Sequence, residues 1–218
     1  MRNITIKQAQ ESDIPIVENI LLDTINWLNE KGQPLWGADE VKWDSLSKNY
    51  QFSNFYIAYS DGIPSGCMAL IDYDPFFWPD VKKGESLFVH KLSAIKTARK
   101  TGVADALMDF YKEQGKIRGV KSLRLDTHAL RPKLRAFYER HGFVFVEVKV
   151  FNGDRHTAFY VYHLNDREEN TIKIETIDDA DEKTATTRKI MHALPAWFSP
   201  PEDIEKKAKT SRKGWFFV

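Results

Sequence analysis

The alternation of apolar and polar residues predicts a mixed α/β fold. Short apolar runs favour strands, and apolar residues at helical spacing favour helices between them. The predicted strands are residues 4–6, 55–59, 66–71, 87–92, 120–126, 143–151 and 156–164. The predicted helices are residues 12–32, 39–48, 102–116 and 133–141. A central strand–helix–strand unit flanked by antiparallel hairpins, one of them turning at Asp61-Gly62, indicates a mixed sheet.

The stretch Arg99-Lys100-Thr101-Gly102-Val103-Ala104 lies between the apolar run 87–92 and the helical pattern that follows. Backbone N–H groups in the first turn of a helix have no intrahelical acceptor, and the helix dipole adds positive charge there. Gly102 and Ala104 would let the backbone come close to a ligand. The stretch therefore predicts a site for an anionic phosphate, although a basic helix cap would explain the same six residues.

The second half of the chain carries a more specific pattern. A β-rich run at 120–126 is followed by a short helical segment that ends in Tyr138-Glu139-Arg140-His141-Gly142-Phe143. This order resembles the GNAT (Gcn5-related) N-acetyltransferase superfamily over roughly residues 3 to 164. The resemblance implies an α/β GNAT fold, with a mixed, mostly antiparallel sheet and a central strand–turn–helix site for acetyl-coenzyme A (acetyl-CoA).

The same resemblance implies an acyltransferase that moves acetyl from acetyl-CoA to a primary amine of a small molecule or peptide. Two alternatives stay open: a degenerate domain that binds coenzyme A without catalysis, and a protein-interaction module without cofactor. The implied cofactor-binding residues are Leu92, Ser93, Ala94, Arg99, Lys100, Thr101, Gly102, Val103, Ala104, Asp105 and Arg131. Arg131 stands where the family often has an asparagine, and because arginine accepts no hydrogen bond this contact would be changed or lost.

Two residues are implied in catalysis. Tyr138 matches the tyrosine that many family members use as general acid toward the departing thiolate. His90 matches the histidine of the arylalkylamine acetyltransferase branch, and its side chain suits a general base near neutral pH. The glutamate of another branch is replaced by Phe88. Either Tyr138 or His90 could instead be an ordinary packing residue.

Aromatic and acidic residues outside these motifs are candidates for acceptor binding. By the resemblance, the first two helices form one wall of the acceptor cleft, so Trp27 and Trp36 could line it. Asp72 and Asp74 lie in an aromatic loop before the central strand and could bind an amine. Simple packing is the alternative for the tryptophans, and a hydrophobic plug at the sheet is the alternative for the loop.

Composition narrows the class of protein. The 218 residues are 42% hydrophobic and carry a net charge of +1, so there is no global basic field that would suggest a nucleic-acid partner. No apolar stretch approaches the ~20 residues that a membrane-spanning helix needs. Cys67 is the only cysteine, so a reducing compartment is expected. The six histidines show no metal-ligand spacing, and no metal is expected. We therefore expect a cytoplasmic protein with an amine substrate and neither nucleic acid nor membrane as partner.

The composition changes after residue 165, where the predicted GNAT domain 1–165 ends. Residues 166–183 contain eight acidic and three basic residues and predict an acidic linker with a possible short strand at Ile172–Ile174. Residues 184–218 predict either a partial second GNAT-like module or a helical tail. The apolar end Trp215-Phe216-Phe217-Val218 could mediate homo-oligomerisation.

Overall fold

The computed structural model describes residues 3–151, 153–164 and 179–193. The chain divides into two compact units, Met1–Arg167 and Glu168–Val218. The first unit contains the sheet and every predicted site residue. In the second unit the described part is helix α6, Ala180–Ala193.

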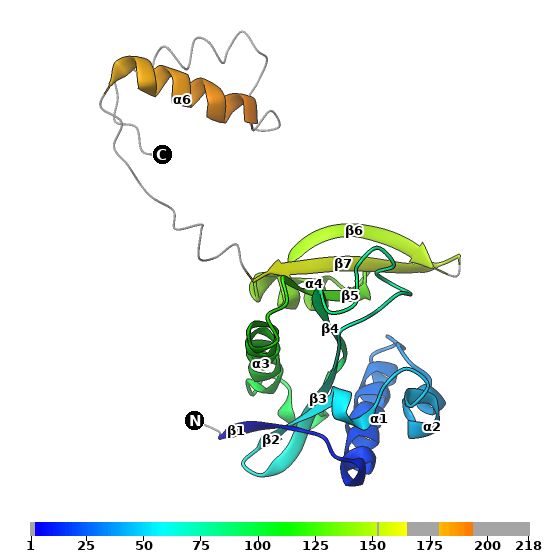
Figure 1. The fold of residues 1–218 in the computed structure, drawn as a ribbon. Coiled ribbons are helices and arrows are strands. Elements are labelled where there is room, and N and C mark those ends of the chain that lie inside the picture. The colour runs from blue at the N-terminus through cyan, green and yellow to red at the C-terminus, as the bar shows by residue number, and fades with distance from the viewer. Residues whose placement is uncertain (1–2, 152, 165–178, 194–218) are drawn as a thin grey trace. The chain divides into compact units, whose positions relative to one another are not determined.

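The first unit is built on a seven-stranded sheet with the order β1-β2-β3-β4-β5-β7-β6 (Figure 1). Strands β4 and β5 run parallel and the other neighbours are antiparallel. The strands are β1 (Ile4–Gln8), β2 (Phe55–Ser60), β3 (Ile63–Ile71), β4 (Ser86–Ala94), β5 (Ser122–His128), β6 (Val144–Phe151) and β7 (Arg155–His163). The predicted mixed, mostly antiparallel sheet is confirmed.

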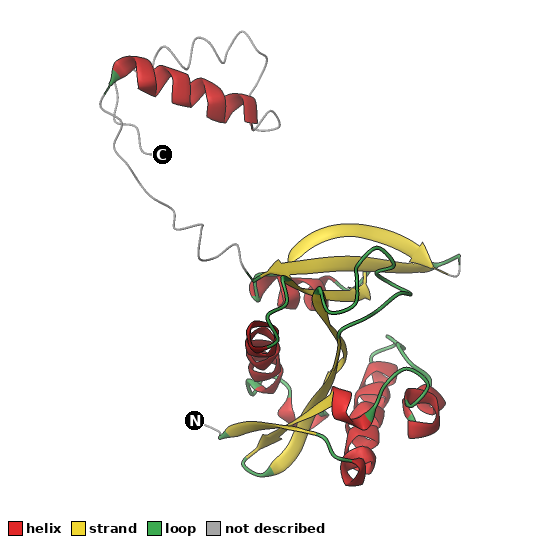
Figure 2. Cartoon of the chain, in the orientation of Figure 1, coloured by secondary structure: helices red, strands yellow, loops and turns green. Residues whose placement is uncertain are grey.

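Helices cover both faces of the sheet, as Figure 2 shows. The α-helices of this unit are α1 (Ile14–Glu30), α2 (Trp43–Leu46), α3 (Val103–Ile117) and α4 (Pro132–Arg140). The 3-10 helices are η1 (Glu11–Asp13), η2 (Ala38–Val41), η3 (Phe52–Asn54) and η4 (Lys96–Ala98). Because strand side chains alternate, Tyr56 and Met68 pack in the apolar cluster of α3, whereas Ile57 and Cys67 pack in that of α1. The central strands are therefore buried on both sides.

Strand β4 is irregular on both of its edges. On the β5 side, pairing ends at Phe88 and Arg124, although both strands continue. On the β3 side, Ser93 pairs with Cys67 and His90 with Ala69. Two residues of β4, Lys91 and Leu92, therefore stand opposite one residue of β3, which is a β-bulge. Lys91 adopts the left-handed backbone region, with φ of 55°.

The structure corrects one expected helix. Residues 39–48 form two short pieces, η2 and α2, because Lys42 between them is extended at φ −72° and ψ 150°. The backbone N–H of Trp43 at the start of α2 donates to the Glu18 carboxylate of α1. Helix α6 begins at Ala180, inside the region expected to be a linker. The expected strand at 172–174 and the terminal segment 194–218 lie outside the described residues.

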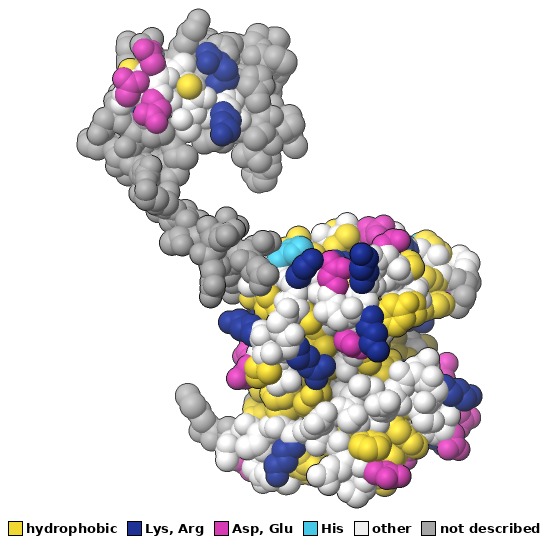
Figure 3. All heavy atoms as spheres, in the orientation of Figure 1, with side chains coloured by type: hydrophobic (Ala, Val, Ile, Leu, Met, Phe, Trp, Pro, Cys, Tyr) yellow, Lys and Arg dark blue, Asp and Glu magenta, His cyan; other side chains and the backbone are white. Residues whose placement is uncertain are grey.

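The surface of the first unit mixes charges of both signs. On the face drawn in Figure 3, Lys and Arg side chains are interspersed with Asp and Glu and with apolar patches. The edge strand β6 exposes apolar side chains, including Val144 at 62% and Val150 at 53%. Among the helices of the described residues, none has the length and apolar character needed to cross a membrane.

Candidate active site

The first of two neighbouring cavities lies between the end of β4, the turn before α3, and α4. Its volume is about 780 Å³. We call it the turn cavity. The residues that line it are Leu92, Ser93, Ala94, Ala98, Arg99, Lys100, Gly102, Ala104, Asp105, Lys133, Leu134, Ala136, Phe137 and Arg140.

The turn before α3 presents backbone N–H groups to this cavity. Lys100 and Gly102 both adopt positive φ, 62° and 91°, which bends the chain sharply into the helix. The first helical hydrogen bond runs from the Ala106 N–H to the Gly102 carbonyl. The N–H groups of the first three helical residues, 103–105, therefore have no acceptor within the helix, and an anion can accept from them.

Charged side chains surround the same turn. The Arg99 guanidinium lies 3.5 Å above the Trp27 ring, and its Nε and Nη2 are buried without a hydrogen-bond partner among the described residues. The Asp105 carboxylate is held by Arg140 at 2.6 Å and by His141 at 3.0 Å. Its negative charge is therefore compensated by the Arg140 guanidinium. Unpaired buried donors beside unsatisfied helix N–H groups fit the pyrophosphate of a nucleotide cofactor.

Most of the residues expected to bind cofactor line the turn cavity, and three do not. The Thr101 hydroxyl donates to the Ala98 carbonyl at 2.7 Å, and Val103 is fully buried in the core. Arg131 lies in the second cavity, where its Nη2 donates to the carbonyls of Gln33 and Pro34, each at 2.9 Å. In this structure Arg131 therefore fixes the loop after α1.

The second cavity opens where β4 and β5 separate, and its volume is about 450 Å³. We call it the strand cavity. Leu92 and Leu134 line both cavities, so the two share a wall. The strand cavity is lined by Leu35, Trp36, Glu40, Ser45, Asn49, Tyr50, Phe76, Phe77, Val89, His90, Lys91, Leu92, Asp126, Thr127, His128, Arg131, Leu134, Tyr138 and Arg155.

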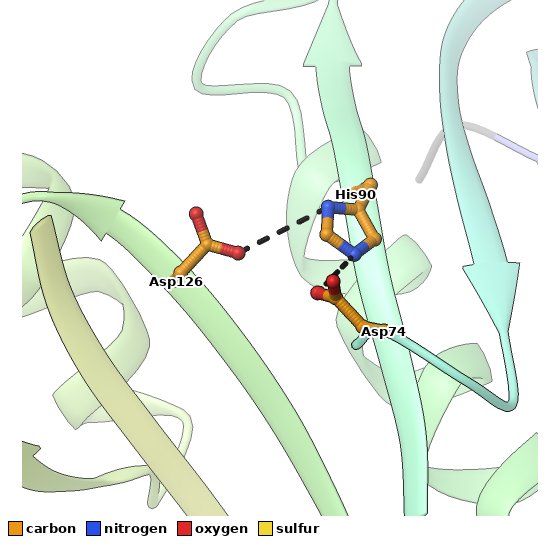
Figure 4. A group of neighbouring side chains, drawn as sticks. All are labelled: Asp74, His90 and Asp126. Carbon is orange, nitrogen blue, oxygen red and sulfur yellow. Dashed lines mark ion pairs between the residues drawn. The ribbon is translucent and has the colours of Figure 1, made fainter. Parts of the chain in front are cut away.

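His90 is flanked by two carboxylates (Figure 4). Its Nε2 lies 3.2 Å from Asp74 Oδ2, and its Nδ1 lies 3.9 Å from Asp126 Oδ1. The Nε2 contact is within ion-pair distance without the alignment of a hydrogen bond, and both of its atoms are buried. The ring of Tyr50 lies 6.1 Å from the imidazole, centroid to centroid. The bulge of β4, the loop before it and β5 thus bring together three titratable groups from distant parts of the sequence.

These three side chains are also of the types that ligate metal ions. Candidate ligand atoms of Asp74, His90 and Asp126 all lie within 4.8 Å of one another. The two carboxylates, however, face different nitrogens of the imidazole (Figure 4). A metal ion binds one ring nitrogen and needs its other ligands on the same side. The arrangement therefore suits proton handling better than metal binding.

Burial shifts the protonation of the groups around His90. It raises the pKa of the Asp126 carboxyl. His90 acts in the opposite direction and lowers this pKa, and the negative charge of Asp74 raises it. Burial also raises the pKa of the Tyr138 phenol, and the negative charge of Asp126 adds to the effect. The pKa of Tyr50 is raised in the same way, by burial and then by Asp74 and Asp126. Both phenols therefore remain protonated at neutral pH.

The expected acceptor residues divide into two pairs. Trp36 lines the strand cavity, and Asp74 contacts His90. Trp27 lies beneath Arg99 and lines neither cavity, while Asp72 is exposed and its carbonyl accepts from the Gly84 N–H. In the same loop as Asp74, Trp78 packs on Phe88 and Phe159 of the sheet, as expected if this part of the loop is a hydrophobic plug.

Sequence reasoning missed several residues of the strand cavity. Asp126 ends a predicted strand beside the central one, so its position was a usable signal. Tyr50, Lys91 and Arg155 gave no such signal, because loop conformation and the bulge bring them to the cavity.

Comparison with known proteins adds independent findings. The model of the acetyltransferase (GNAT) family matches residues 21–143. No curated protein matches the chain. Among solved structures, a GNAT family acetyltransferase from Listeria monocytogenes is similar, with a TM-score of 0.61 and 19% identity over 74% of this chain and 95% of that one.

Two further solved structures share the fold. The ribosomal-protein-S18-alanine N-acetyltransferase from Escherichia coli gives a TM-score of 0.55 at 15% identity, covering 74% of this chain and 94% of that one. N-acetylglutamate synthase from Neisseria gonorrhoeae, in complex with coenzyme A and N-acetyl-glutamate, gives 0.55 at 20% identity over 75% of this chain and 35% of that one.

Proposed function

Because the chain belongs to the GNAT acetyltransferase family, we propose that it transfers acetyl from acetyl-CoA to a primary amine of a small molecule or peptide. The observation that carries the proposal is the wall shared by the two cavities at Leu92 and Leu134. One cavity offers an anion-binding turn and the other offers His90 and Tyr138. The complex of the Neisseria gonorrhoeae neighbour with coenzyme A supports the choice of cofactor.

The turn cavity is the proposed cofactor site. The N–H groups at the start of α3 and the buried donors of Arg99 would hold the pyrophosphate. Ser93 and Ala94 of β4 line the same cavity and would hold the arm that leads to Leu92. When bound, acetyl-CoA supplies the acetyl group as a thioester. The reaction forms an N–C bond, breaks the C–S bond, removes one proton from the amine and adds one to the leaving thiolate.

His90 is the proposed general base. With the imidazole proton on Nε2 beside Asp74, the lone pair of Nδ1 is the acceptor for the amine proton. Asp126, 3.9 Å from Nδ1, places negative charge where a cationic amine would arrive. Asp74 orients the ring, as a carboxylate does for a catalytic histidine elsewhere.

Tyr138 is the proposed general acid. Its side chain is buried and lines the strand cavity near the shared wall. Burial and Asp126 raise the pKa of its phenol, so the hydroxyl holds its proton until a thiolate forms. A positioned acid of this kind typically contributes about 10²–10⁴-fold to a rate.

A thiol-release screen with acetyl-CoA tests the function. The acceptors are simple amines, polyamines, aminoglycosides and peptide N-termini, and acetyl-CoA binding is followed in parallel by the melting temperature. We expect stabilisation by acetyl-CoA and thiol release with at least one amine. Stabilisation without release from any amine, even in a single turnover, would favour the degenerate coenzyme A-binding domain. No stabilisation at all would contradict the cofactor assignment.

A further inference from the structure

We propose that the acceptor amine also carries a carboxylate, so that the substrate is a small amino acid-like molecule. The proposal rests on the proposed acetyl transfer and narrows its acceptor. It follows from three cationic side chains, Lys91, Arg131 and Arg155, that line the strand cavity together with His90 and Asp126.

None of the three cations forms an ion pair with an acidic residue of the described chain. The cavity contains two carboxylates, and each has another neighbour. Glu40 accepts a hydrogen bond from the Gly37 N–H at 3.0 Å, and Asp126 faces His90. Like charges around one cavity repel, and a bound anion would reverse that cost.

The cations are held in place by contacts that leave donors for a ligand. Lys91 Nζ lies 4.3 Å from the centroid of the Trp36 ring, and Arg155 lies 5.5 Å from that of Phe77. The hydrogen bonds of Arg131 to Gln33 and Pro34 use Nη2 alone, so Nε and Nη1 have no recorded partner among the described residues. A planar guanidinium with free N–H groups binds a carboxylate in a bidentate manner.

Electrostatic effects on neighbouring groups indicate that the cations are close to one another. Burial lowers the pKa of His128, and the charges of Arg131 and Arg155 lower it further. Burial lowers the pKa of Lys91 to about 8, Glu40 and Asp126 oppose this shift, and Arg155 contributes in the same direction as burial. The three cations therefore form one cationic region around the cavity, with Glu40 and Asp126 as its acidic neighbours.

The strand cavity thus has two charged features of opposite sign. Asp126 beside His90 suits an amine, and the three cations suit a carboxylate. Trp36, Tyr50, Phe76 and Phe77 provide aromatic walls between the loops and the sheet. The volume of about 450 Å³ lies within the range of small-molecule sites. One small molecule that bears both groups on an apolar body fits this combination.

Matched pairs of acceptors test the proposal. Each aromatic or aliphatic L-amino acid is compared with its carboxamide, which keeps the amine and the shape but removes the negative charge. In thiol-release assays we expect the best amino acid to exceed its carboxamide about 10-fold or more in kcat/KM, the scale of a charged hydrogen bond. Equal or better turnover of the carboxamide would overturn the proposal and leave acetyl transfer intact.

Two variants localise the effect. Arg155→Gln and Lys91→Met should each lower the preference for the acid over the carboxamide about 10-fold, mainly through KM for the acid. Arg118→Gln is the matched control, because Arg118 is exposed, donates to Tyr56 and lines neither cavity. An unchanged preference in both test variants would overturn the proposal, and so would thiol release confined to amines outside both sets. Absence of both acetyl-CoA binding and release would instead defeat the proposed function itself.

Discussion

The two cavities differ in how the chain builds them. The turn cavity depends on one continuous segment, 99–105, whose backbone N–H groups and positive φ angles create the anion site. The strand cavity is assembled from side chains of η2, α2, β4, β5, α4, the start of β7 and four loops. A site made from the backbone of one continuous segment can be predicted from the sequence. A site made from side chains of several elements can be recognised only when the positions of those elements are known.

The largest expected effect lies in the strand cavity. Tyr138→Phe should lower turnover by about one to three orders of magnitude, because the buried phenol is the proposed proton donor. The affinity for acetyl-CoA, measured by calorimetry, should change little. The matched control is Tyr73→Phe on the exposed loop before β4. Equal losses in affinity and rate would make Tyr138 a structural residue.

A substitution at Gly102 tests the turn cavity without changing a residue of the strand cavity. Gly102→Val should abolish most of the melting-temperature increase caused by acetyl-CoA, because a branched side chain at φ 91° strains the turn and obstructs the phosphate. Gly62→Val is matched to it, since Gly62 has φ 82°, open surroundings and no place in either cavity. A full increase in a folded Gly102→Val variant would contradict the phosphate assignment.

The strand cavity should respond to pH through His90. In His90→Gln the acidic limb of the kcat/KM profile should disappear, because glutamine cannot take the amine proton. His163→Gln, at the exposed end of β7, serves as control. A limb that persists unchanged in His90→Gln would point to another base.

A smaller effect is expected from Lys91. A pKa of about 8 means that this ammonium is charged below that pH and neutral above it. A bound carboxylate stabilises the charged form, so affinity for the N-acetyl derivative of the best amino acid acceptor should fall severalfold as pH rises from 7 to 9. Glu40, Arg155 and Asp126 also act on Lys91, and Lys91→Met should remove the dependence. Calorimetry at the two pH values checks this, and a flat wild-type profile would contradict it.

The smallest effect is expected from the second unit. No described residue beyond Arg155 lines either cavity. Deleting residues 166–218 should therefore leave stabilisation by acetyl-CoA unchanged. The mass in solution, compared with that of the full chain, tests the predicted oligomerisation through this segment. Loss of cofactor binding without a change in mass would show that the segment completes the first unit.

Much of the fold could be predicted from the sequence. The strands and the helix after the turn follow from apolar periodicity, and the turn follows from Gly102 beside basic residues. The expected helix over 39–48 was wrong because the extended backbone at Lys42 interrupts it. That interruption accompanies a tertiary hydrogen bond from Trp43 to Glu18, which local propensity does not contain.

The site was predicted unevenly for the same reason. His90, Tyr138 and Asp74 were expected from motifs and loop chemistry, and the structure brings His90 and Asp74 to 3.2 Å. The partnership of His90 with Asp126 depends on the separation of β4 from β5. The cationic region depends on side chains 64 residues apart, from Lys91 to Arg155. Such contacts are set by packing rather than by spacing.

The bulge in β4 makes the fold sensitive to the loss of a single residue near Lys91 and Leu92. Lys91 and Leu92 share a single partner, Met68, so loss of either residue would restore even pairing. Loss of a bulge residue would straighten β4 between His90 and the turn, and loss of a residue after Leu92 would shift the register and turn later side chains to the opposite face. Between His90 and the turn at 99–105, single-residue deletions should therefore be far more damaging than substitutions. The same change in the β2–β3 turn at Asp61-Gly62, outside both cavities, should be tolerated much better.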